Sequence, residues 1–547
     1  MRDGQKVAVI GAALTVLVGA AGFGAYTLIG DTSDGGDGQD VAVAEGGADG
    51  AVETGPPSAE EVRATAGEFL TAWQSGKTDE AAALTDDEAA AAKALASFRK
   101  DVRVAQARFE QGSATGADVP FTVTAQVAYD GQQRAGWTYR SKLTVVRDTA
   151  TGKPVVDWKP SVLHPELKDG QSLRTAEAEA PPIKALDRNG TELTAEAHPE
   201  LAAILTDLRK RYGDKTDGRP GVEARIVDAR GKEVKTLKEF SKGTPGELRT
   251  TLDAKVQKAA VRAIAGKPRA SVVALKASTG EILAVANTPA GGFNTALKGS
   301  LAPGSTMKIV TASLLLEKGL ASSSKQHPCP KYFTHGGWRF QNLDKFEIKG
   351  GTFAQSFAAS CNTAFISQAG KLKDDDLTRQ ARDVFGIGLP WQVGTATFDG
   401  SVPVQSDAQM AASLIGQGGV RANPLIMASV SATVKSGTFH QPYIVSPEVD
   451  GRALAKAPRS LPAPISQELR SLMRLTATSG SAAEAMAGTT GDFGAKTGSA
   501  EVDGQEKPNA WFTAYRNDMA AAAVVPASGH GGKNAGPVVR AVLNSAG

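Results

Sequence analysis

Residues 303–308, Pro-Gly-Ser-Thr-Met-Lys, are followed by a mostly apolar run at 309–316. If a helix begins near Ser305, residues three apart share one face, so the Lys308 amine can reach the Ser305 hydroxyl. The apolar run predicts that this helix is buried, and burial disfavours the ammonium form of Lys308. A neutral lysine could take the proton of Ser305 and make it a nucleophile. The alternative is an exposed helix start with a solvated lysine, because Ser-x-x-Lys is common on its own.

A second short motif, Ser-Cys-Asn, lies at 360–362. In an extended loop or at a helix start, Ser360 can offer a hydroxyl for proton relay, and Asn362 can offer an amide for hydrogen bonds to a substrate. The alternative is that Ser360 only caps a helix. The triplet therefore indicates a catalytic role only in combination with other motifs of the chain.

A third motif begins at Lys496 and reads Lys-Thr-Gly-Ser. In a strand beside a cleft, Gly498 would let a substrate backbone approach closely. Lys496 supplies positive charge there, and Thr497 and Ser499 offer hydroxyls to a carboxylate. The backbone N–H groups of Ser305 and Ser499 are the candidates for an oxyanion hole. Taken alone, Lys-Thr-Gly is more often a turn than a site.

The three motifs occur in the order that marks penicillin-recognising serine enzymes: Ser-x-x-Lys, then Ser-x-Asn, then Lys-Thr-Gly. On these residues the chain resembles the monofunctional, class B-like penicillin-binding proteins, a family of D,D-transpeptidases. Flanking segments that match the same family lie at 274–284, 293–294, 416–418, 423–425, 427–428 and 509–512. The resemblance implies a penicillin-binding transpeptidase domain at 247–547.

The resemblance also implies an acyl-transfer mechanism on a peptidoglycan stem peptide. Ser305 would attack the penultimate D-alanine carbonyl, Lys308 would accept its proton, and Ser360 would relay protons to the leaving D-alanine. Asn362 would hold the donor amide, and the terminal carboxylate would be held by Lys496, Thr497 and Ser499. A β-lactam would occupy the same site as a covalent inhibitor; the alternative is a resistant enzyme with low β-lactam affinity. An amine from a neighbouring stem would resolve the acyl-enzyme, and no cofactor is implied.

The catalytic unit is expected to hold one antiparallel sheet with helices on both sides and a helical subdomain, the serine transpeptidase or β-lactamase-like fold. Two apolar runs at 271–275 and 282–286, joined by a Ser-Thr-Gly turn, predict a hairpin. Runs at 511–515 and 520–525 predict two more strands, and a helix is expected at about 537–543. The whole chain is therefore expected to be multidomain α+β.

A small α+β unit is expected at 58–167. Ser58 can cap a helix whose apolar residues recur at helical spacing. A period of two then predicts antiparallel strands, for example at 121–129. Residues 68–73 and 158–165 resemble the nuclear transport factor 2-like N-terminal domain of methicillin-resistance-type penicillin-binding proteins. That resemblance implies a cone-shaped stalk that lifts the catalytic unit away from a membrane.

The charged segment at 168–246 is expected to be a small pedestal or dimerisation-like domain. Residues 183–190 predict a strand followed by an Asn-Gly turn. They are similar to the pedestal that opens monofunctional penicillin-binding proteins. No chemistry is assigned to this segment.

Residues 7–29 are apolar apart from two threonines and one tyrosine, which is long enough for a helix to cross a hydrocarbon layer of about 30 Å. Arg2 and Lys6 precede this run and favour a cytoplasmic N-terminus with an exported remainder. Residues 1–30 are therefore expected to be a cytoplasmic tip and single-pass membrane anchor; a cleaved signal peptide is the alternative. The acidic, Gly-rich stretch at 31–57 cannot bury enough apolar surface to fold, so a disordered linker is expected.

Composition limits the other function classes. A formal net charge of +3 makes nucleic acid a poor partner. Six histidines without metal-ligand spacing, and only two cysteines, argue against a metal site. Cys329 and Cys361 would both be exported, where a disulfide can persist and would fix the loop of Ser360. The alternative is a loop thiol at Cys329 and a buried small side chain at Cys361.

Other activities remain open from the sequence. They are a D,D-carboxypeptidase or β-lactamase-type hydrolase, in which water resolves the acyl-enzyme, and a non-catalytic β-lactam-binding scaffold. The anchor and the long stalk favour a transpeptidase, because a secreted β-lactamase needs neither. The segment between linker and catalytic unit, 58–246, lacks the Glu-Asp pattern of a glycosyltransferase. A separate glycosyltransferase is therefore an expected partner, with peptidoglycan stem peptides as substrate.

Overall fold

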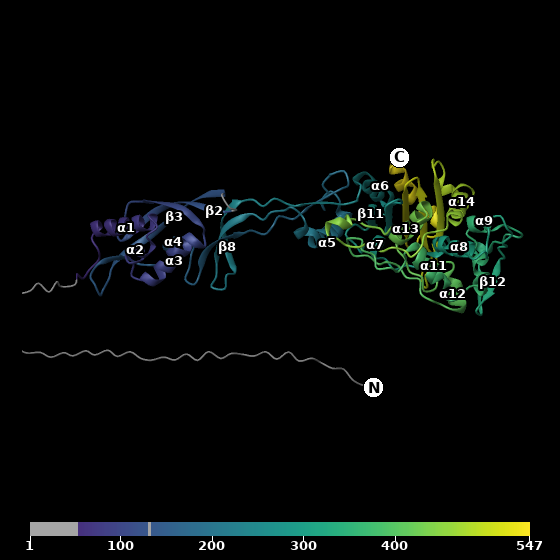
Figure 1. Ribbon diagram of the computed structural model, residues 1–547, viewed down its shortest axis with the longest axis horizontal. Coiled ribbons are helices and arrows are strands. Elements are labelled where there is room, and N and C mark those ends of the chain that lie inside the picture. Colours follow the sequence, from purple (N-terminus) through teal and green to yellow (C-terminus); the bar gives the residue numbers. More distant parts are fainter. Residues whose placement is uncertain (1–52, 130–132, 547) are drawn as a thin grey trace, which may run out of the picture.

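The computed structural model describes residues 53–129 and 133–546, which Figure 1 shows as an elongated molecule with a lobe at each end. The segment at 7–29, expected to be the membrane anchor, and most of the linker at 31–57 lie outside the described residues. Among the helices that are described, none combines the length and the apolar character needed to cross a bilayer. Both lobes contain helices and antiparallel strands, so the fold is mixed α+β.

The N-terminal lobe packs helices against one face of an antiparallel sheet. Its helices are α1 (Ala59–Gln74), α2 (Thr78–Ala82), α3 (Glu88–Lys100) and α4 (Pro160–Leu163). Its strands lie side by side in chain order: β1 (Val104–Gln111), β2 (Asp118–Tyr129), β3 (Gln133–Arg147) and β4 (Pro154–Val156). Ser58 caps α1 in a reciprocal capping box with Glu61. Trp73 of α1 stacks on Phe109 of β1 with ring centroids 4.1 Å apart, so aromatic side chains hold helix and sheet together.

The segment between the lobes divides between them. The strands β5 (Ser172–Glu177), β7 (Val222–Val227) and β8 (Glu233–Ser241) form a sheet beside the N-terminal lobe, whereas β6 (Lys184–Leu186), α5 (Ala202–Tyr212) and β9 (Glu247–Arg249) lie with the C-terminal lobe. Leu173 and Ile226 belong to the N-terminal core, and Leu205 and Leu208 belong to the C-terminal core. Within the described residues, the expected pedestal at 168–246 therefore contributes to two cores and forms none of its own.

The chain crosses between the lobes three times as a result. The connecting segments are 178–183, 216–221 and 242–246. Arg219 and Thr244 exchange two backbone hydrogen bonds of 2.9 Å, and the Ala178 N–H donates to the Gly221 carbonyl at 2.8 Å. The three segments run together between the lobes as a hydrogen-bonded bundle (Figure 1).

A five-stranded antiparallel sheet forms the centre of the C-terminal lobe. Across the sheet the strands are β11 (Ile282–Thr288), β10 (Ala270–Lys276), β16 (Met519–Val525), β15 (Asn509–Arg516) and β14 (Phe493–Ala500). The hairpin expected from 271–275 and 282–286 is β10–β11. The strands expected at 511–515 and 520–525 lie within β15 and β16. The third motif is carried by β14, which is an edge strand.

Helices cover both faces of this sheet. On one side lie α6 (Ala254–Ile264) and α17 (Gly536–Leu543), and on the other lies α13 (Pro424–Ser436). Alternate residues of β16 enter the two cores: Ala521 belongs to one and Ala522 to the other. Every residue of β16 is buried. Its small side chains allow helices to approach from both sides.

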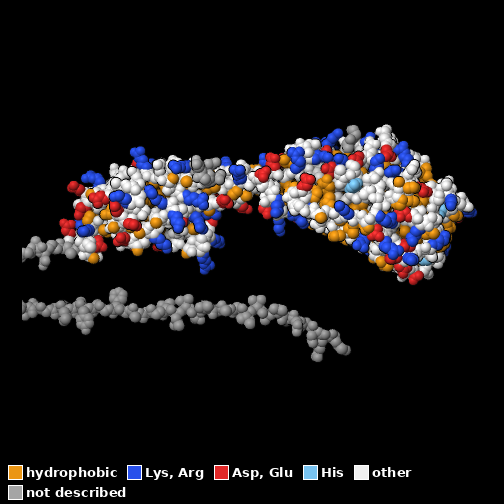
Figure 2. Space-filling view, in the orientation of Figure 1, with side chains coloured by type: hydrophobic (Ala, Val, Ile, Leu, Met, Phe, Trp, Pro, Cys, Tyr) orange, Lys and Arg blue, Asp and Glu red, His pale blue; other side chains and the backbone are white. Residues whose placement is uncertain are grey.

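A helical subdomain lies beside the edge strand. It contains α8 (Lys308–Glu317), α9 (Phe353–Ala358), α10 (Asn362–Ile366), α11 (Asp376–Phe385), α12 (Asp407–Ser413) and α14 (Ala463–Ser479). A small hairpin, β12 (Tyr332–His335) with β13 (Trp338–Gln341), lies at its outer end (Figure 1). On the face drawn in Figure 2, basic and acidic side chains are interspersed over both lobes, in keeping with the small net charge.

Candidate active site

Ser305 lies in a 3-10 turn, η3 (Gly304–Met307), that leads directly into α8. A helix start was expected here; the structure has the tighter turn, and Lys308 is the first α-helical residue. Gly304 has a φ of +54°. A Cβ at Gly304 would lie 3.0 Å from the Ser499 carbonyl oxygen. The turn that carries the nucleophile candidate therefore rests directly against β14.

Glycines make this close packing possible. A Cβ at Gly498 would meet the Pro303 oxygen and Thr306 Cγ2, both at 3.0 Å. A Cβ at Gly531 would lie 2.1 Å from the Trp511 oxygen and 2.3 Å from the Gly498 oxygen. From the sequence, Gly498 was expected to let a substrate backbone approach closely. Glycine is also needed there because the η3 turn packs directly on β14.

Lys308 is completely buried, and its amine is held by the second motif. Its Nζ donates to the Ser360 carbonyl and to Asn362 Oδ1, both at 2.7 Å. The expected contact with Ser305 Oγ is not among the hydrogen bonds of the described residues. Burial, and secondarily the charge of Lys496, lowers the pKa of Lys308 well below its usual range.

Ser360 connects the two lysines. It lies in the turn between α9 and α10 with a φ of +60°, in the left-handed region. Its hydroxyl accepts a hydrogen bond from Lys496 Nζ at 2.8 Å, while its carbonyl accepts from Lys308. The structure therefore joins residues of all three motifs in one hydrogen-bonded chain.

Lys496 is also completely buried. Besides Ser360, its Nζ contacts the Thr497 carbonyl at 3.1 Å. Burial lowers the pKa of Lys496 to about 7. The Phe357 ring centroid lies 5.6 Å from this amine, and that of Phe365 lies 5.5 Å from the Lys308 amine. The rings keep water away from both amines and interact favourably with a cation.

Neither lysine forms an ion pair with an acidic side chain in the described part of the chain; their amines bond to neutral oxygens instead. Desolvation and the repulsion between two nearby ammonium groups both favour the neutral form of one of them. A buried neutral lysine beside a serine is the arrangement that general-base activation requires. The described residues contain no group of three or more His, Cys, Asp or Glu side chains placed to hold a metal ion.

Thr497 has a hydroxyl partner that the sequence did not reveal. Its Oγ1 lies 2.6 Å from Ser481 Oγ. The Ser481 N–H donates to the Ala358 carbonyl at 2.9 Å, which ties this hydroxyl pair to the end of α9. Ser481 belongs to no recognisable motif, so only the fold brings it to the site. Ser499, two residues beyond Thr497, is half-buried.

A cavity of 570 Å³ lies beside the nucleophile turn, beyond the end of β14. Ala302 and Gln417 line it on the side of that turn, and Val502 and Gln505 line it on the side of the third motif. Phe293 also lines the cavity and is 69% exposed. Its lining includes no residue of the three motifs, so the cavity adjoins the site at the end of the sheet and does not contain it.

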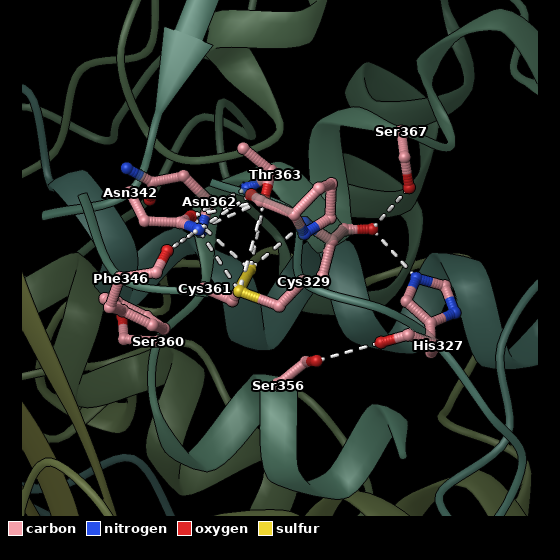
Figure 3. The surroundings of a disulfide bond; sticks show 12 residues. His327, Cys329, Asn342, Phe346, Ser356, Ser360, Cys361, Asn362, Thr363 and Ser367 are labelled. Atoms are coloured by element: carbon pink, nitrogen blue, oxygen red, sulfur yellow. Dashed lines mark hydrogen bonds between the residues drawn. A yellow bond between two sulfur atoms is a disulfide. The ribbon is translucent and has the colours of Figure 1, made fainter. Parts of the chain in front are cut away.

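Cys329 and Cys361 form a disulfide beside the second motif, with Cα atoms 6.1 Å apart (Figure 3). Of the two readings left open by the sequence, the structure has the bridge. The Cys361 sulfur also caps α10, accepting the Ala364 N–H at 3.2 Å. The bridge therefore ties the residue between Ser360 and Asn362 to a second loop.

Asn342 is a further residue at the site that no sequence pattern indicated. It lies next to the disulfide and is 1% exposed (Figure 3). Its Oδ1 accepts the backbone N–H groups of Asn362 and Thr363 at 2.8 and 3.1 Å. An isolated asparagine after a short strand has many possible roles, so its place at the site follows only from the fold.

Both lobes match known sequence families. The family described as penicillin binding protein transpeptidase domain matches residues 270–544, and the NTF2-like N-terminal transpeptidase domain matches residues 61–171. The first match covers half of the chain. The chain belongs to the penicillin-binding protein transpeptidase family, whose members are serine acyltransferases.

Individual relatives agree with this family. The chain is 28% identical over 363 residues to the peptidoglycan D,D-transpeptidase PbpA of Mycolicibacterium smegmatis, covering 55% of this chain and 72% of that protein. It is 26% identical over 367 residues to PbpA of Mycobacterium tuberculosis, with the same coverage. The fold is shared with a solved structure whose title reads "Structural coordination of polymerization and crosslinking by a peptidoglycan synthase complex". The TM-score is 0.54 and the sequence identity is 21%. The match covers 69% of this chain and 92% of that chain.

Proposed function

We propose that Ser305 is the nucleophile of a peptidoglycan D,D-transpeptidase that cross-links stem peptides through a serine acyl-enzyme. The observation that carries this assignment is the hydrogen-bonded chain through Lys308, Ser360 and Lys496, which joins the three motifs beside the nucleophile's turn. Two buried amines without an acidic partner are costly to the fold. Their cost is explained if they serve proton transfer and substrate binding. A β-lactam would acylate the same serine.

The chemistry follows from these groups. Ser305 Oγ attacks the penultimate D-alanine carbonyl carbon, and the neutral Lys308 amine takes the hydroxyl proton. The backbone N–H groups of Ser305 and Ser499 stabilise the oxyanion that forms. Collapse breaks the peptide bond, and Ser360 relays the proton held by Lys308 to the leaving D-alanine amine. The amine of a neighbouring stem then attacks the ester and gives its proton to the neutral Lys308, which passes it to Ser305 Oγ as the ester bond breaks and the cross-link forms.

The donor stem would lie along the free edge of β14. An edge strand has unpaired backbone groups that an extended peptide can join. The charge of Lys496 and the hydroxyls of Thr497 and Ser499 would hold the terminal carboxylate, and Asn362 would hold the donor amide.

The proposal includes a single-pass anchor at 7–29, with the catalytic lobe outside the cytoplasmic membrane. The apolar length of this run and the basic residues Arg2 and Lys6 before it support that topology. The N-terminal lobe would then be a stalk. A separate glycosyltransferase is proposed as partner, supported by the shared fold with a chain of a peptidoglycan synthase complex.

The test is the intact mass of the full-length protein in detergent after incubation with benzylpenicillin, beside its Ser305→Ala variant. We expect an adduct of one drug mass on the wild type and none on the variant. Incubation with a stem pentapeptide and an acceptor amine should then release D-alanine and form a cross-linked product. Release of D-alanine without a cross-link would indicate a carboxypeptidase, and rapid drug hydrolysis would indicate a β-lactamase. A folded wild type that forms no adduct and releases no D-alanine would indicate a non-catalytic scaffold.

A further inference from the structure

We propose that Asn342 is a positioning residue of the acylation site, whose side chain fixes the start of α10 and, through Asn362, the amine of Lys308. The inference rests on the proposed function, in which Lys308 is the base. Asn342 follows β13 directly and is separated from Asn362 by 20 positions in the chain. Its side chain is buried, so its amide has to find all of its hydrogen-bond partners inside the protein.

The oxygen of this amide caps α10. Asn342 Oδ1 accepts the N–H groups of Asn362 and Thr363, the first two residues of the helix. A helix start leaves such N–H groups without partners of its own. The next N–H, that of Ala364, is taken by the Cys361 sulfur. A side chain from another loop therefore does most of the capping of the helix that carries Asn362.

The nitrogen of the same amide binds the two loop segments that contain Pro330 and Phe346. Asn342 Nδ2 donates to the Pro330 carbonyl at 3.0 Å and to the Phe346 carbonyl at 2.9 Å (Figure 3). Pro330 directly follows Cys329 of the disulfide. An amide has two N–H donors and one oxygen with two lone pairs, so these four bonds match its capacity. Thr363 Oγ1 and the Cys329 sulfur are further neighbours of Nδ2, each at 3.2 Å. Removing the side chain would leave four buried backbone groups without this partner.

Gln341, the residue before Asn342, binds the side chain of Asn362. The Gln341 carbonyl accepts a hydrogen bond from Asn362 Nδ2 at 3.0 Å, while Asn362 Oδ1 accepts from Lys308 Nζ at 2.7 Å. Two successive residues, Gln341 and Asn342, thus hold the side chain and the backbone of Asn362. Any rotation of α10 would displace the Asn362 contact of Lys308.

The disulfide does not perform this task. The Cys329–Cys361 bridge limits the distance between two loops, and its Cys361 sulfur accepts only the Ala364 N–H of α10. Hydrogen bonds to two successive N–H groups fix a direction as well as a distance. The orientation of Asn362 therefore depends on Asn342.

A matched control exists elsewhere in the same lobe. Asn423 is also completely buried, and its Nδ2 donates to the Leu297 and Phe398 carbonyls at 2.9 and 2.8 Å. Its Oδ1 accepts the Ile426 N–H at 3.0 Å at the start of α13. Asn423→Ala thus removes the same kind of cap and loop contact without touching the three motifs. Asn342→Ala and Asn423→Ala should cost similar stability.

The first measurement is amide hydrogen exchange of the full-length protein in detergent, which needs no activity. We expect Asn342→Ala to speed exchange in a peptide that covers 360–364, and Asn423→Ala to speed it near the start of α13 instead. The second measurement is the acylation rate with benzylpenicillin. We expect a loss of about 10²-fold for Asn342→Ala, the size associated with a misplacement of about 1 Å, and a rate near that of the wild type for Asn423→Ala.

These outcomes separate the inference from the proposed function. If the wild type neither forms an adduct nor releases D-alanine, the proposed function fails, and exchange at 360–364 still decides whether Asn342 holds α10. Unchanged exchange there in Asn342→Ala overturns the inference. Equal acylation losses in Asn342→Ala and Asn423→Ala also overturn it.

Discussion

The sheets of the two lobes are packed in opposite ways. In the N-terminal lobe helices cover one face, and large aromatic side chains such as Trp73 and Phe109 fill the space between helix and sheet. In the catalytic lobe both faces are covered, and β16 consists of four alanines, two valines and a methionine, all buried. Large side chains can adjust their rotamers, whereas a backbone packed on both sides through alanine and glycine has little room to move. The catalytic lobe therefore fixes the position of its edge strand, β14.

The lobes also treat buried charge differently. In the N-terminal lobe the largely buried Arg147 is paired with Glu61 at 2.9 Å. In the catalytic lobe Lys308 and Lys496 are completely buried and contact only neutral oxygens. A paired charge serves the fold, whereas an unpaired buried amine is ready to change its protonation state. Buried Asp376 of the catalytic lobe is paired with Lys318 and Arg379, so the two lysines differ from the buried charges around them as well.

Removing the proposed base should have the largest effect. Lys308→Ala is expected to lower the acylation rate by about 10²–10⁴-fold, because general-base catalysis contributes that much. The measurement is the second-order rate of adduct formation with benzylpenicillin. Arg147→Ala removes the paired cation of the other lobe and should leave this rate unchanged. Acylation of Lys308→Ala at the wild-type rate would contradict the assignment of the base.

Truncating an aromatic residue of the N-terminal lobe should affect stability alone. Trp73→Ala is expected to reduce the stability of the N-terminal lobe by about 3–5 kcal/mol, the usual cost for a large buried side chain. Hydrogen exchange of peptides from α1 and β1 measures this loss. The acylation rate should remain that of the wild type. A parallel fall in acylation would show that the two lobes are coupled more tightly than their separate cores suggest.

Lowering the pH should reduce the stability of the two lobes in different pH ranges. Burial lowers the pKa of His164 in the N-terminal lobe to about 4 and that of Lys496 to about 7. Between each folded-state pKa and the ordinary value, the unfolded chain binds a proton that the folded lobe does not, so stability falls as the pH is lowered. We expect losses of at most about 1.4 kcal/mol per pH unit from each group. The N-terminal lobe should lose stability from about pH 6.5 to 4, and the catalytic lobe from about pH 10.4 to 7.

Lobe-specific hydrogen exchange across these pH ranges is the measurement. His164→Phe should flatten the acid-side dependence of the N-terminal lobe and leave the catalytic lobe unchanged. Stability of the catalytic lobe that does not rise between pH 7 and 10 would contradict a neutral lysine in the folded site.

The same substitution should have opposite signs in the two lobes. Gly531→Ala is expected to destabilise the catalytic lobe by about 1–3 kcal/mol and to slow acylation, because its Cβ would meet the Trp511 and Gly498 oxygens. Gly67→Ala in α1 should stabilise the N-terminal lobe by about 0.5–1 kcal/mol, since a Cβ there meets only the end of the Gln111 side chain at 3.3 Å. Denaturation of each variant checks both signs, and a stabilising Gly531→Ala would disprove the close packing.

The sequence could predict what is local. Ser305 and Lys308 lie within one turn, and the hairpin of β10 and β11 follows from two apolar runs and a turn, so short-range patterns were enough. The contacts of Ser360 could not be predicted, because they join residues 52 and 136 positions apart. Asn342 and Ser481 carry no local signal, and only the packing of distant loops brings them to the site. The middle segment was expected to be one unit because charge and length do not reveal which core each apolar residue enters.

The three connecting segments have a mechanical consequence. A single linker would let two bodies swivel, but three segments that bond to one another transmit torque from one body to the other. Cutting one of them, for example with a protease, would leave the other two intact and the bodies still attached. A force on one body is therefore shared by three hydrogen-bonded segments and not carried by one alone.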